Sequence, residues 1–173
     1  MTHQTIRRAT ESDAALLADL GARTFYDSFA VQNTPENMAA YLAASFGPEQ
    51  QRAELVDPQN TFLIIENDGV AMGYAQLRAG KPPASVSDSK AIELVRLYVS
   101  SSCQGTGIGG RLMDACLTEA RQAGYQTIWL GVWQQNTRAQ RFYQRWNFFV
   151  VGDHIFQLGA DRQLDWLMER SLG

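Results

Sequence analysis

The chain has 173 residues, of which 45% are hydrophobic and 19% are charged, and its formal net charge at pH 7 is -3. This composition is typical of a globular protein, and the length favours one compact domain over residues 1–173. The charges are mixed along the chain without long runs of one sign. That pattern argues against a nucleic-acid partner held by electrostatics.

Cysteine and histidine content excludes two further classes of protein. Two cysteines, Cys103 and Cys116, do not make a disulfide framework, and His3 and His154 do not form a cluster at metal-ligand spacing, so no metal is expected. The N-terminal segment lacks an apolar signal region, and no apolar stretch is long enough to span a bilayer. We therefore expect a cytoplasmic protein with no membrane partner, in which neither histidine has a special role.

Helices dominate the first part of the chain and a hairpin follows. Thr34 is a good N-cap and Pro35 suits the first helical position, so they predict a helix start. Asp68 and Gly69 tolerate positive φ and predict a hairpin turn. The predicted elements are a strand at 5–8, helices at 10–29, 35–46 and 49–55, and strands at 61–66 and 70–78.

Strands and helices alternate in the second part of the chain. Residues 81–89, rich in Pro, Ser and Asp, are expected to form a loop beside a ligand site. The predicted elements are strands at 91–99 and 126–133, helices at 108–123 and 137–146, and closing strands at 148–151 and 154–158. This order predicts an α/β fold with a mixed sheet, part of it parallel.

A glycine-rich loop joins the strand at 91–99 to the next helix. Its glycines allow backbone N–H groups to approach a ligand closely, and the positive end of the helix dipole points at the same place. The segment therefore predicts an anion site, most naturally for phosphate. A Walker loop would need Gly-Lys-Ser/Thr where Gly109-Gly110-Arg111 stands. A dinucleotide fingerprint would need another glycine spacing, near the first strand of the sheet.

The loop resembles the coenzyme A signature of the GNAT superfamily of N-acetyltransferases. The resemblance begins with Gln104-x-x-Gly107-x-Gly109, which follows a Leu-Tyr-Val strand end. Downstream the family's strand, Asn-capped helix and closing strand are matched by Gly131-Val132-Trp133-x-x-Asn136-x-x-Ala139-x-x-Phe142-Tyr143-x-x-x-Asn147-Phe148. Asn147 stands where the family usually has Gly, but Asn also tolerates the left-handed conformation after a helix.

This resemblance covers roughly residues 5–167 and implies a fold and a cosubstrate. The implied fold is the α/β (α+β) GNAT fold, with a mixed central sheet, a V-shaped splay of its parallel strands around acetyl-CoA, and helices on both faces. The implied reaction transfers an acetyl group from acetyl-CoA to an amine directly, within a ternary complex. Exposed aromatic residues such as Trp133 and Trp146 point to a possible homodimer.

The same resemblance implies roles for individual residues. Leu97 and Val99 would offer backbone hydrogen bonds to the pantetheine arm, the glycine loop would hold the pyrophosphate, and Tyr143 would protonate the departing thiolate as general acid. The residues expected to bind acetyl-CoA are Leu97, Tyr98, Val99, Gln104, Gly105, Thr106, Gly107, Ile108, Gly109, Gly110, Asn136 and Tyr143. Arg138 is expected on a solvated helix face.

A general base is also required, because an amine with a pKa of about 10.4 is almost fully protonated at neutral pH. The family often places a carboxylate on the strand that enters the cofactor loop, so Glu93 is the first candidate for this catalytic role. Glu66 and Asp27 are poorer candidates.

The first two helices resemble those of bacterial spermidine/spermine N-acetyltransferases, where they cover the acceptor site. Phe25, Tyr26, Phe29 and Tyr41 are therefore expected to bind the substrate. Aromatic faces and carboxylates suit a small-molecule amine, with a polyamine as one possibility. Two alternatives remain open: acetylation of a protein N-terminus or lysine, and an acyl-CoA-binding regulatory module without turnover.

Overall fold

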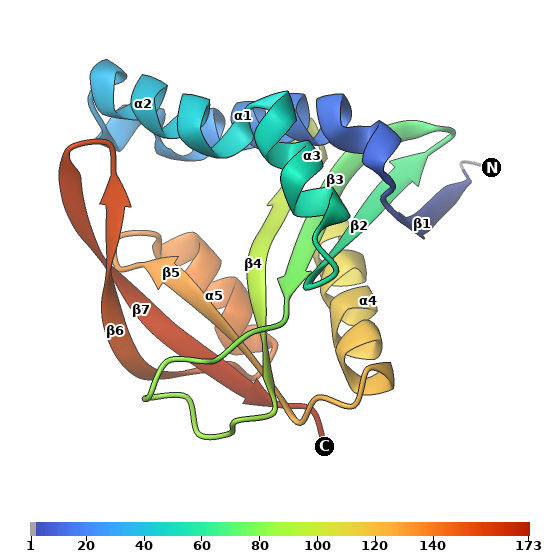
Figure 1. Cartoon of the computed structure of the whole chain (residues 1–173), viewed down its shortest axis with the longest axis vertical. Helices are drawn as coiled ribbons and strands as arrows, with labels where there is room; N and C mark the ends of the chain where they lie inside the picture. The colour runs from blue at the N-terminus through green and yellow to red at the C-terminus, as the bar shows by residue number, and fades with distance from the viewer. Residues whose placement is uncertain (1–2) are drawn as a thin grey trace.

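A mixed seven-stranded sheet organises the molecule in the computed structural model, which describes residues 3–173 (Figure 1). The strands are β1 (Gln4–Arg8), β2 (Asn60–Asn67), β3 (Val70–Arg78), β4 (Ala91–Val99), β5 (Thr127–Trp133), β6 (Phe149–Leu158) and β7 (Asp161–Ser171), in the spatial order β1-β2-β3-β4-β5-β7-β6. The helices are α1 (Ala14–Phe29), α2 (Pro35–Phe46), α3 (Pro48–Val56), α4 (Ile108–Gln122) and α5 (Thr137–Arg145), with short 3-10 turns at Glu11–Asp13, Ala30–Gln32 and Ser101–Cys103. Within residues 3–173, no helix is long and apolar enough to cross a membrane.

The central pair of strands opens like a V. β4 and β5 run parallel and pair only through Ala91–Thr127, Ile92–Ile128 and Glu93–Trp129, whereas every other neighbouring pair is antiparallel. Beyond this short ladder the two strands diverge (Figure 1). The predicted mixed sheet with a splayed parallel pair is therefore confirmed.

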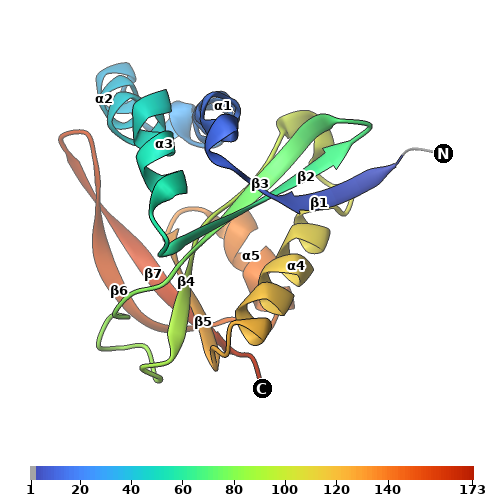
Figure 2. The same ribbon diagram turned by 45° about the vertical axis from the view of Figure 1, so that its right-hand side comes forward.

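Helices cover both faces of the sheet because its strands alternate apolar residues between two cores. On one face, Leu17 and Leu20 of α1 pack with Phe62, Ile64 and Tyr74. The other face of β2 and β3 packs against α4 and α5 in the largest core cluster. Figure 2 shows α1 to α3 on one side of the sheet and α4 and α5 on the other.

Several predicted boundaries are confirmed by their local geometry. The Thr34 hydroxyl accepts a hydrogen bond from the Asn37 N–H at 3.2 Å, which caps α2 behind Pro35. Asp68 and Gly69 have positive φ in the β2–β3 turn. Asn147 also has positive φ, at 63°, where the chain leaves α5.

Two predictions at the ends of the chain need correction. The expected closing strands at 148–151 and 154–158 are one continuous strand, β6, with a register shift between Val150 and Gly152. A β-bulge accommodates the glycine there without ending the strand. β7 was not predicted as a separate element, and it lies between β5 and β6. At the other end, the first turn of the expected helix at 10–29 is the 3-10 turn before α1.

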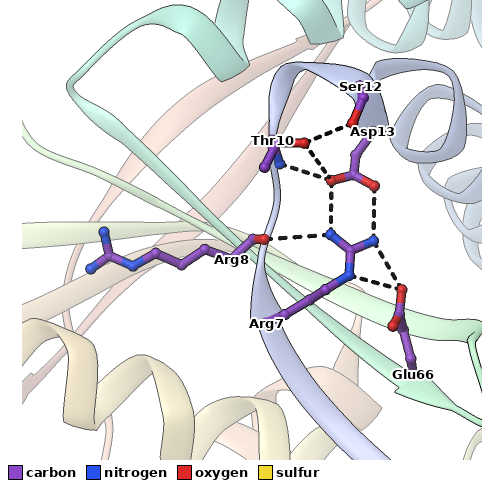
Figure 3. A network of polar contacts seen from close by, with 6 residues as sticks. All are labelled: Arg7, Arg8, Thr10, Ser12, Asp13 and Glu66. Atoms are coloured by element: carbon purple, nitrogen blue, oxygen red, sulfur yellow. Dashed lines mark hydrogen bonds and ion pairs between the residues drawn. The ribbon is translucent and has the colours of Figure 1, made fainter.

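A polar network joins β1 to the start of α1 and to β2 (Figure 3). The guanidinium of Arg7 donates to both carboxylate oxygens of Asp13, at 2.8 and 2.9 Å, and to Glu66 at 3.0 Å. Asp13 also accepts from the Thr10 N–H at 2.8 Å. Because its hydrogen bonds with Arg7 and Thr10 favour the charged form, the pKa of Asp13 lies below its ordinary value.

Asp13→Asn should therefore lower the free energy of unfolding at pH 7 by about 1–3 kcal/mol, since it leaves Arg7 and the Thr10 N–H poorly paired. A lowered folded-state pKa gives stability that is present above the ordinary carboxyl pKa and is lost as pH falls through the folded value. Urea unfolding across the acidic range checks both points. Asp19→Asn, at an exposed ion pair with Arg23, is the control and should cost under about 1 kcal/mol. Equal effects of the two variants would contradict the network's importance.

Candidate active site

The backbone of β4 presents free hydrogen-bonding groups to the opening. The N–H of Ser100, just past the strand, donates to the carbonyl of Met72 on β3 at 2.9 Å. In an antiparallel pair, hydrogen-bonded residues alternate with residues whose polar groups face the other way. Leu97 and Val99 fall in this second class and point their N–H and C=O groups toward the gap beside β5. Of these groups, the Val99 carbonyl accepts from the Gln104 side chain, and the pantetheine contacts expected from the sequence stay a prediction.

The glycine loop forms an anion cradle at the top of β4. Gly105 and Gly107 have φ of 78° and 86°, and a Cβ added to either would meet nothing within 4 Å. Within residues 3–173, the N–H groups of residues 105–110 have no protein hydrogen-bond acceptor of ordinary geometry. These donors, together with the N-terminus of α4, fit a pyrophosphate group.

Side chains around this loop differ in what they can contribute. Ile108 is buried in the core, so only its N–H faces the cradle. A Cβ on Gly109 would lie 3.6 Å from Phe142 and one on Gly110 would lie 3.5 Å from Trp146, which are ordinary contacts. Packing within the protein therefore does not require these two glycines. Close approach of a ligand to the backbone would require them. Thr106 donates its hydroxyl to the carbonyl of Cys103, within the loop.

Gln104 ties the loop to β4 and to α5. Its amide Nε2 donates to the Val99 carbonyl at 3.3 Å, and its Oε1 accepts from the guanidinium of Arg138 at 2.7 Å. Arg138 is exposed on α5, as the sequence predicts for a solvated helix face, and its hydrogen bond to Gln104 also brings it beside the glycine loop. A fixed positive charge at this point favours an anionic ligand. The only signal in the sequence is that Arg138 follows the Asn136 cap by two residues.

Asn136 caps α5 at the end of β5. Its side-chain oxygen accepts from the Ala139 N–H at 3.2 Å, so only the amide nitrogen of its side chain is available to a ligand. The structure therefore shows the capping role directly and leaves the expected cofactor contact as a prediction.

Two substitutions separate these roles of Asn136. Asn136→Asp keeps an acceptor for the Ala139 N–H, so the free energy of unfolding should stay within about 0.5 kcal/mol of the original. Without the amide donor, however, its affinity for acetyl-CoA should fall about tenfold. Asn136→Ala should lose about 1 kcal/mol of stability as well. Urea unfolding and titration calorimetry measure the two quantities. Unchanged acetyl-CoA affinity in Asn136→Asp would show that the Asn136 side chain caps α5 and does not bind acetyl-CoA.

Tyr143 lies on the face of the sheet that carries α4 and α5. Its ring packs edge-on against Phe142 and Phe148, with ring centroids 5.4 and 5.7 Å away. Burial raises the pKa of Tyr143 above its ordinary value, because a phenolate is poorly solvated there. The hydroxyl therefore keeps its proton over the physiological range, which a general acid must do before it donates.

Glu93 lies on the opposite face of the sheet, at the last residue pair before β4 and β5 diverge. Its carboxylate accepts two hydrogen bonds from Arg78, at 2.8 and 3.2 Å. It also lines a cavity of about 450 Å³ with Arg78, Trp129 and His154. The position suits contact with an acceptor, but Arg78 occupies one oxygen of the carboxylate, Oε2, through both hydrogen bonds. The poorer candidates lie elsewhere, since Glu66 is held by Arg7 and Asp27 is exposed.

An aromatic cluster fills the space between α1, α2 and the same face of the sheet. Phe25 lies 4.6 Å from Phe29 and 4.5 Å from Tyr41 between ring centroids, and Tyr41 lies 5.3 Å from Phe156. Phe46 continues the cluster and contacts Tyr98. The cluster therefore consists of Phe25, Phe29, Tyr41, Phe46, Tyr98 and Phe156.

Two expected site residues are placed differently by the structure. Tyr26 is 54% exposed and points away from the cluster, because it is one helical position round from Phe25. The Tyr98 side chain packs on the acceptor side with Phe46 and Tyr74, not beside Leu97 on the cofactor side. Side chains alternate along a strand, so neighbouring residues of the Leu-Tyr-Val motif face opposite sides. Burial raises the pKa of Tyr98 and of Tyr41.

A buried cation adjoins the cluster. Arg96 of β4 forms an ion pair with Glu54 of α3 at 2.9 Å, and its guanidinium lies 4.8 Å from the centre of the Phe46 ring. The side chain of Arg96 is only 9% exposed. This contact fixes α3 against β4 and closes one side of the cluster.

A roof covers the cluster at its upper end, where α2 meets the β6–β7 turn (Figure 1). The Asn37 side chain accepts from the Ala160 N–H at 3.0 Å, and Gln163 donates to Asn33 at 2.6 Å. Gly159 has positive φ, and a Cβ there would lie 2.7 Å from the Cα of Asn37. The two segments are therefore in close contact at this end of the cluster.

The chain is similar to known proteins in sequence. The chain matches the model of the acetyltransferase (GNAT) family over residues 22–148. An uncharacterized N-acetyltransferase of Mycobacterium tuberculosis is 36% identical over 161 residues, covering 93% of this chain and 99% of that protein. An uncharacterized N-acetyltransferase of Lactobacillus delbrueckii subsp. lactis is 30% identical over 172 residues, covering 99% of each.

The fold agrees with a structure solved with the cofactor. The PaiA N-acetyltransferase of Thermoplasma acidophilum, crystallised with coenzyme A, superposes with a TM-score of 0.77 at 20% identity, covering 98% of this chain and 99% of that one. The free loop amides, the polar backbone of the β4 edge and the α4 N-terminus supply the groups that such a cofactor needs. The chain belongs to the GNAT family and is an acetyl-CoA-dependent N-acetyltransferase.

Proposed function

We propose that the acceptor is the primary amine of a small molecule, with a polyamine as the first candidate. The observation that carries this proposal is the aromatic cluster beside the V-shaped opening, covered at one end by the roof between α2 and the β6–β7 turn. Aromatic faces attract ammonium groups through cation–π contacts. Such cover favours a small acceptor over a folded protein or its flexible terminus.

The charges near the cluster refine the substrate proposal. Asp27 and Glu36, which the sequence suggests as partners for a polycation, are both exposed on the helices. The buried carboxylates on the acceptor side of β7 are Asp165 and Glu169, and Glu169 accepts hydrogen bonds from Ser87. A polyamine would then rely on the rings of Phe29 and Tyr41 along its length and on few carboxylates at its reacting end.

The protein's own groups divide the proposed reaction between two faces of the sheet. Acetyl-CoA supplies the activated acetyl group when bound. On the cofactor face, Leu97 and Val99 orient the ligand through their backbone, while the loop amides hold its phosphates. A strand N–H stabilises negative charge on the acetyl oxygen, and Tyr143 gives its proton to the departing sulfur. On the acceptor face, the amine is bound and loses a proton.

Thiol release from acetyl-CoA tests this proposal. The purified protein is given spermidine, spermine, amino acids, aminoglycosides or basic peptides, with a blank that lacks an acceptor. Strong stimulation by polyamines is the expected result, with amino acids and peptides well below them. Stimulation by peptides alone would overturn the small-molecule proposal in favour of a protein acceptor. Binding of acetyl-CoA without stimulation by any member would favour a regulatory module.

A further inference from the structure

A histidine and a carboxylate meet on the acceptor face of β5. His154 of β6 and Asp165 of β7 are direct cross-strand partners, and His154 Nε2 lies 3.5 Å from Asp165 Oδ2. Both cover Gly131 of β5, where an added Cβ would lie 3.2 Å from His154 Nε2 and 3.3 Å from Asp165 Oδ2. Any larger side chain at residue 131 would displace the pair, so glycine makes room for it.

The register places this pair at the mouth of the V. Trp129 is the last residue of β5 that pairs with β4, opposite Glu93. Gly131 follows two residues later on the same face, because side chains alternate along a strand. Trp133, the next residue on that face, contacts the ring of Phe29 in the aromatic cluster. The His154–Asp165 pair therefore lies between the base of the opening and the proposed acceptor site.

The two members of the pair differ in their access to a ligand. The His154 side chain is 41% exposed and lines the cavity of about 450 Å³ that Glu93 also lines, whereas the Asp165 side chain is 11% exposed. An acceptor in the cavity can thus reach the imidazole, while the carboxylate stays behind it. Within residues 3–173, Asp165 is the polar side-chain partner of the imidazole.

Hydrogen bonding distinguishes His154 from the carboxylate expected from the sequence. Both hydrogen bonds to Glu93 come from the guanidinium of Arg78 and end on one oxygen, Oε2, which the ion pair therefore occupies. An imidazole, in general, titrates close to neutral pH and so exchanges protons readily under the conditions in which acetylation occurs. A carboxylate behind the ring stabilises the imidazolium once it forms, as in other histidine–aspartate pairs.

We infer that His154 is the general base of this N-acetyltransferase and that Asp165 is its positioning residue. The inference rests on the proposed acceptor site. In this step Nδ1 of the neutral imidazole, whose Nε2 faces Asp165, takes one proton from the acceptor ammonium, R–NH₃⁺, which gives imidazolium and the free amine. The nitrogen lone pair is then available for attack on the acetyl carbon, and the proton leaves the imidazolium to solvent through the cavity.

The surroundings of His154 carry charges of both signs. Asp165 lies beside the ring, and Glu93, Arg78 and Lys81 line the same cavity as His154. Burial raises the pKa of Asp165, and the His154 imidazole beside it opposes that shift. The pH dependence of the reaction is therefore read from variants of both residues in the presence of the three other charges.

The first test needs no acceptor. His3→Gln leaves His154 as the single imidazole of the chain, and the NMR signal of its ring proton is followed across neutral pH. Adding Asp165→Asn should lower the titration midpoint by about half a pH unit or more, because a stabilising negative charge is lost. An unchanged midpoint would overturn the inference, since Asp165 would then have no effect on the protonation of the imidazole.

The second test follows kcat/KM against pH with the amine that gives the fastest thiol release. His154→Gln should lower the rate about 100-fold and abolish the rising limb of the profile, with unchanged acetyl-CoA affinity. Asp165→Asn should shift that limb in the direction of the NMR midpoint. The limb should persist in Glu93→Gln and in the His3→Gln control. A limb that survives in His154→Gln but disappears in Glu93→Gln would overturn the inference.

Failure of the proposed function has a different signature. If no panel amine stimulates release by the unaltered protein, the proposed acceptor class is wrong before any variant is compared. The NMR titration still decides whether His154 and Asp165 act as one unit. Activity with amines, but with a pH profile indifferent to both residues, leaves the proposed function intact and overturns the inference alone.

Discussion

Tyr143→Phe is expected to lower kcat about 100-fold or more while the affinity for acetyl-CoA stays the same. The ring packs against Phe142 and Phe148, so removal of the hydroxyl leaves the core contacts of α5 in place. What is lost is the proton donor for the departing thiolate, and general acid catalysis typically contributes 100-fold to 10,000-fold. Steady-state thiol release and titration calorimetry with acetyl-CoA measure the two quantities.

Tyr125→Phe serves as the matched control for this substitution. Tyr125 also packs against the main core cluster, but it follows α4 at the far end from the glycine loop. Its substitution should leave kcat unchanged. A Tyr143→Phe enzyme with the original kcat would remove the general acid from the mechanism and revive the reading of the chain as an acyl-CoA-binding module.

Gly107→Ala is expected to weaken binding of coenzyme A about tenfold or more. Gly107 has φ of 86° at the N-terminus of α4, and a Cβ there would project into the space above the free loop amides. Loss of even one hydrogen bond to a charged phosphate costs about 1.5–3 kcal/mol. A tenfold change in the dissociation constant corresponds to about 1.4 kcal/mol. Titration calorimetry with coenzyme A measures this change without an acceptor.

Gly124→Ala separates cofactor binding from backbone strain. Gly124 has φ of 85° at the other end of α4, and a Cβ there also meets nothing within 4 Å. Both substitutions should therefore destabilise the protein by a similar amount, about 1–2 kcal/mol, through the left-handed conformation alone. Only Gly107→Ala should weaken coenzyme A binding. Equal affinities in the two variants would show that the loop does not hold the phosphates.

Local signals in the sequence predicted most of the elements. Helix starts at Thr34 and Asn136, the hairpin turn at Asp68 and the left-handed Asn147 are set by interactions within a few residues, so they can be read from the chain. The glycine loop belongs to the same class. Its φ values and free amides follow from its own residues and from the adjoining helix.

Features that depend on distant residues were missed. β7 pairs with a strand on each side. Its buried carboxylates, Asp165 and Glu169, interrupt the apolar pattern from which a central strand is predicted. Each of these buried carboxylates has a polar partner elsewhere in the fold. Asp165 lies beside His154, and Glu169 accepts a hydrogen bond from Ser87. No role is predicted for His154 from the sequence for the same reason, because Asp165 lies eleven residues away along the chain.

The short parallel ladder has a consequence for how the protein responds to its ligand. Three residue pairs join one panel of the sheet, β1–β4, to the other, β5–β7–β6, so the backbone ladder at this seam is the shortest in the sheet. A ligand that hydrogen-bonds both Val99, on the first panel, and Asn136, on the second, would link the two panels where β4 and β5 no longer pair. At 100 times its dissociation constant it should raise the free energy of unfolding by about 2.7 kcal/mol. Amide hydrogen exchange should then slow in both panels together, so that cofactor binding makes two loosely joined panels unfold as one.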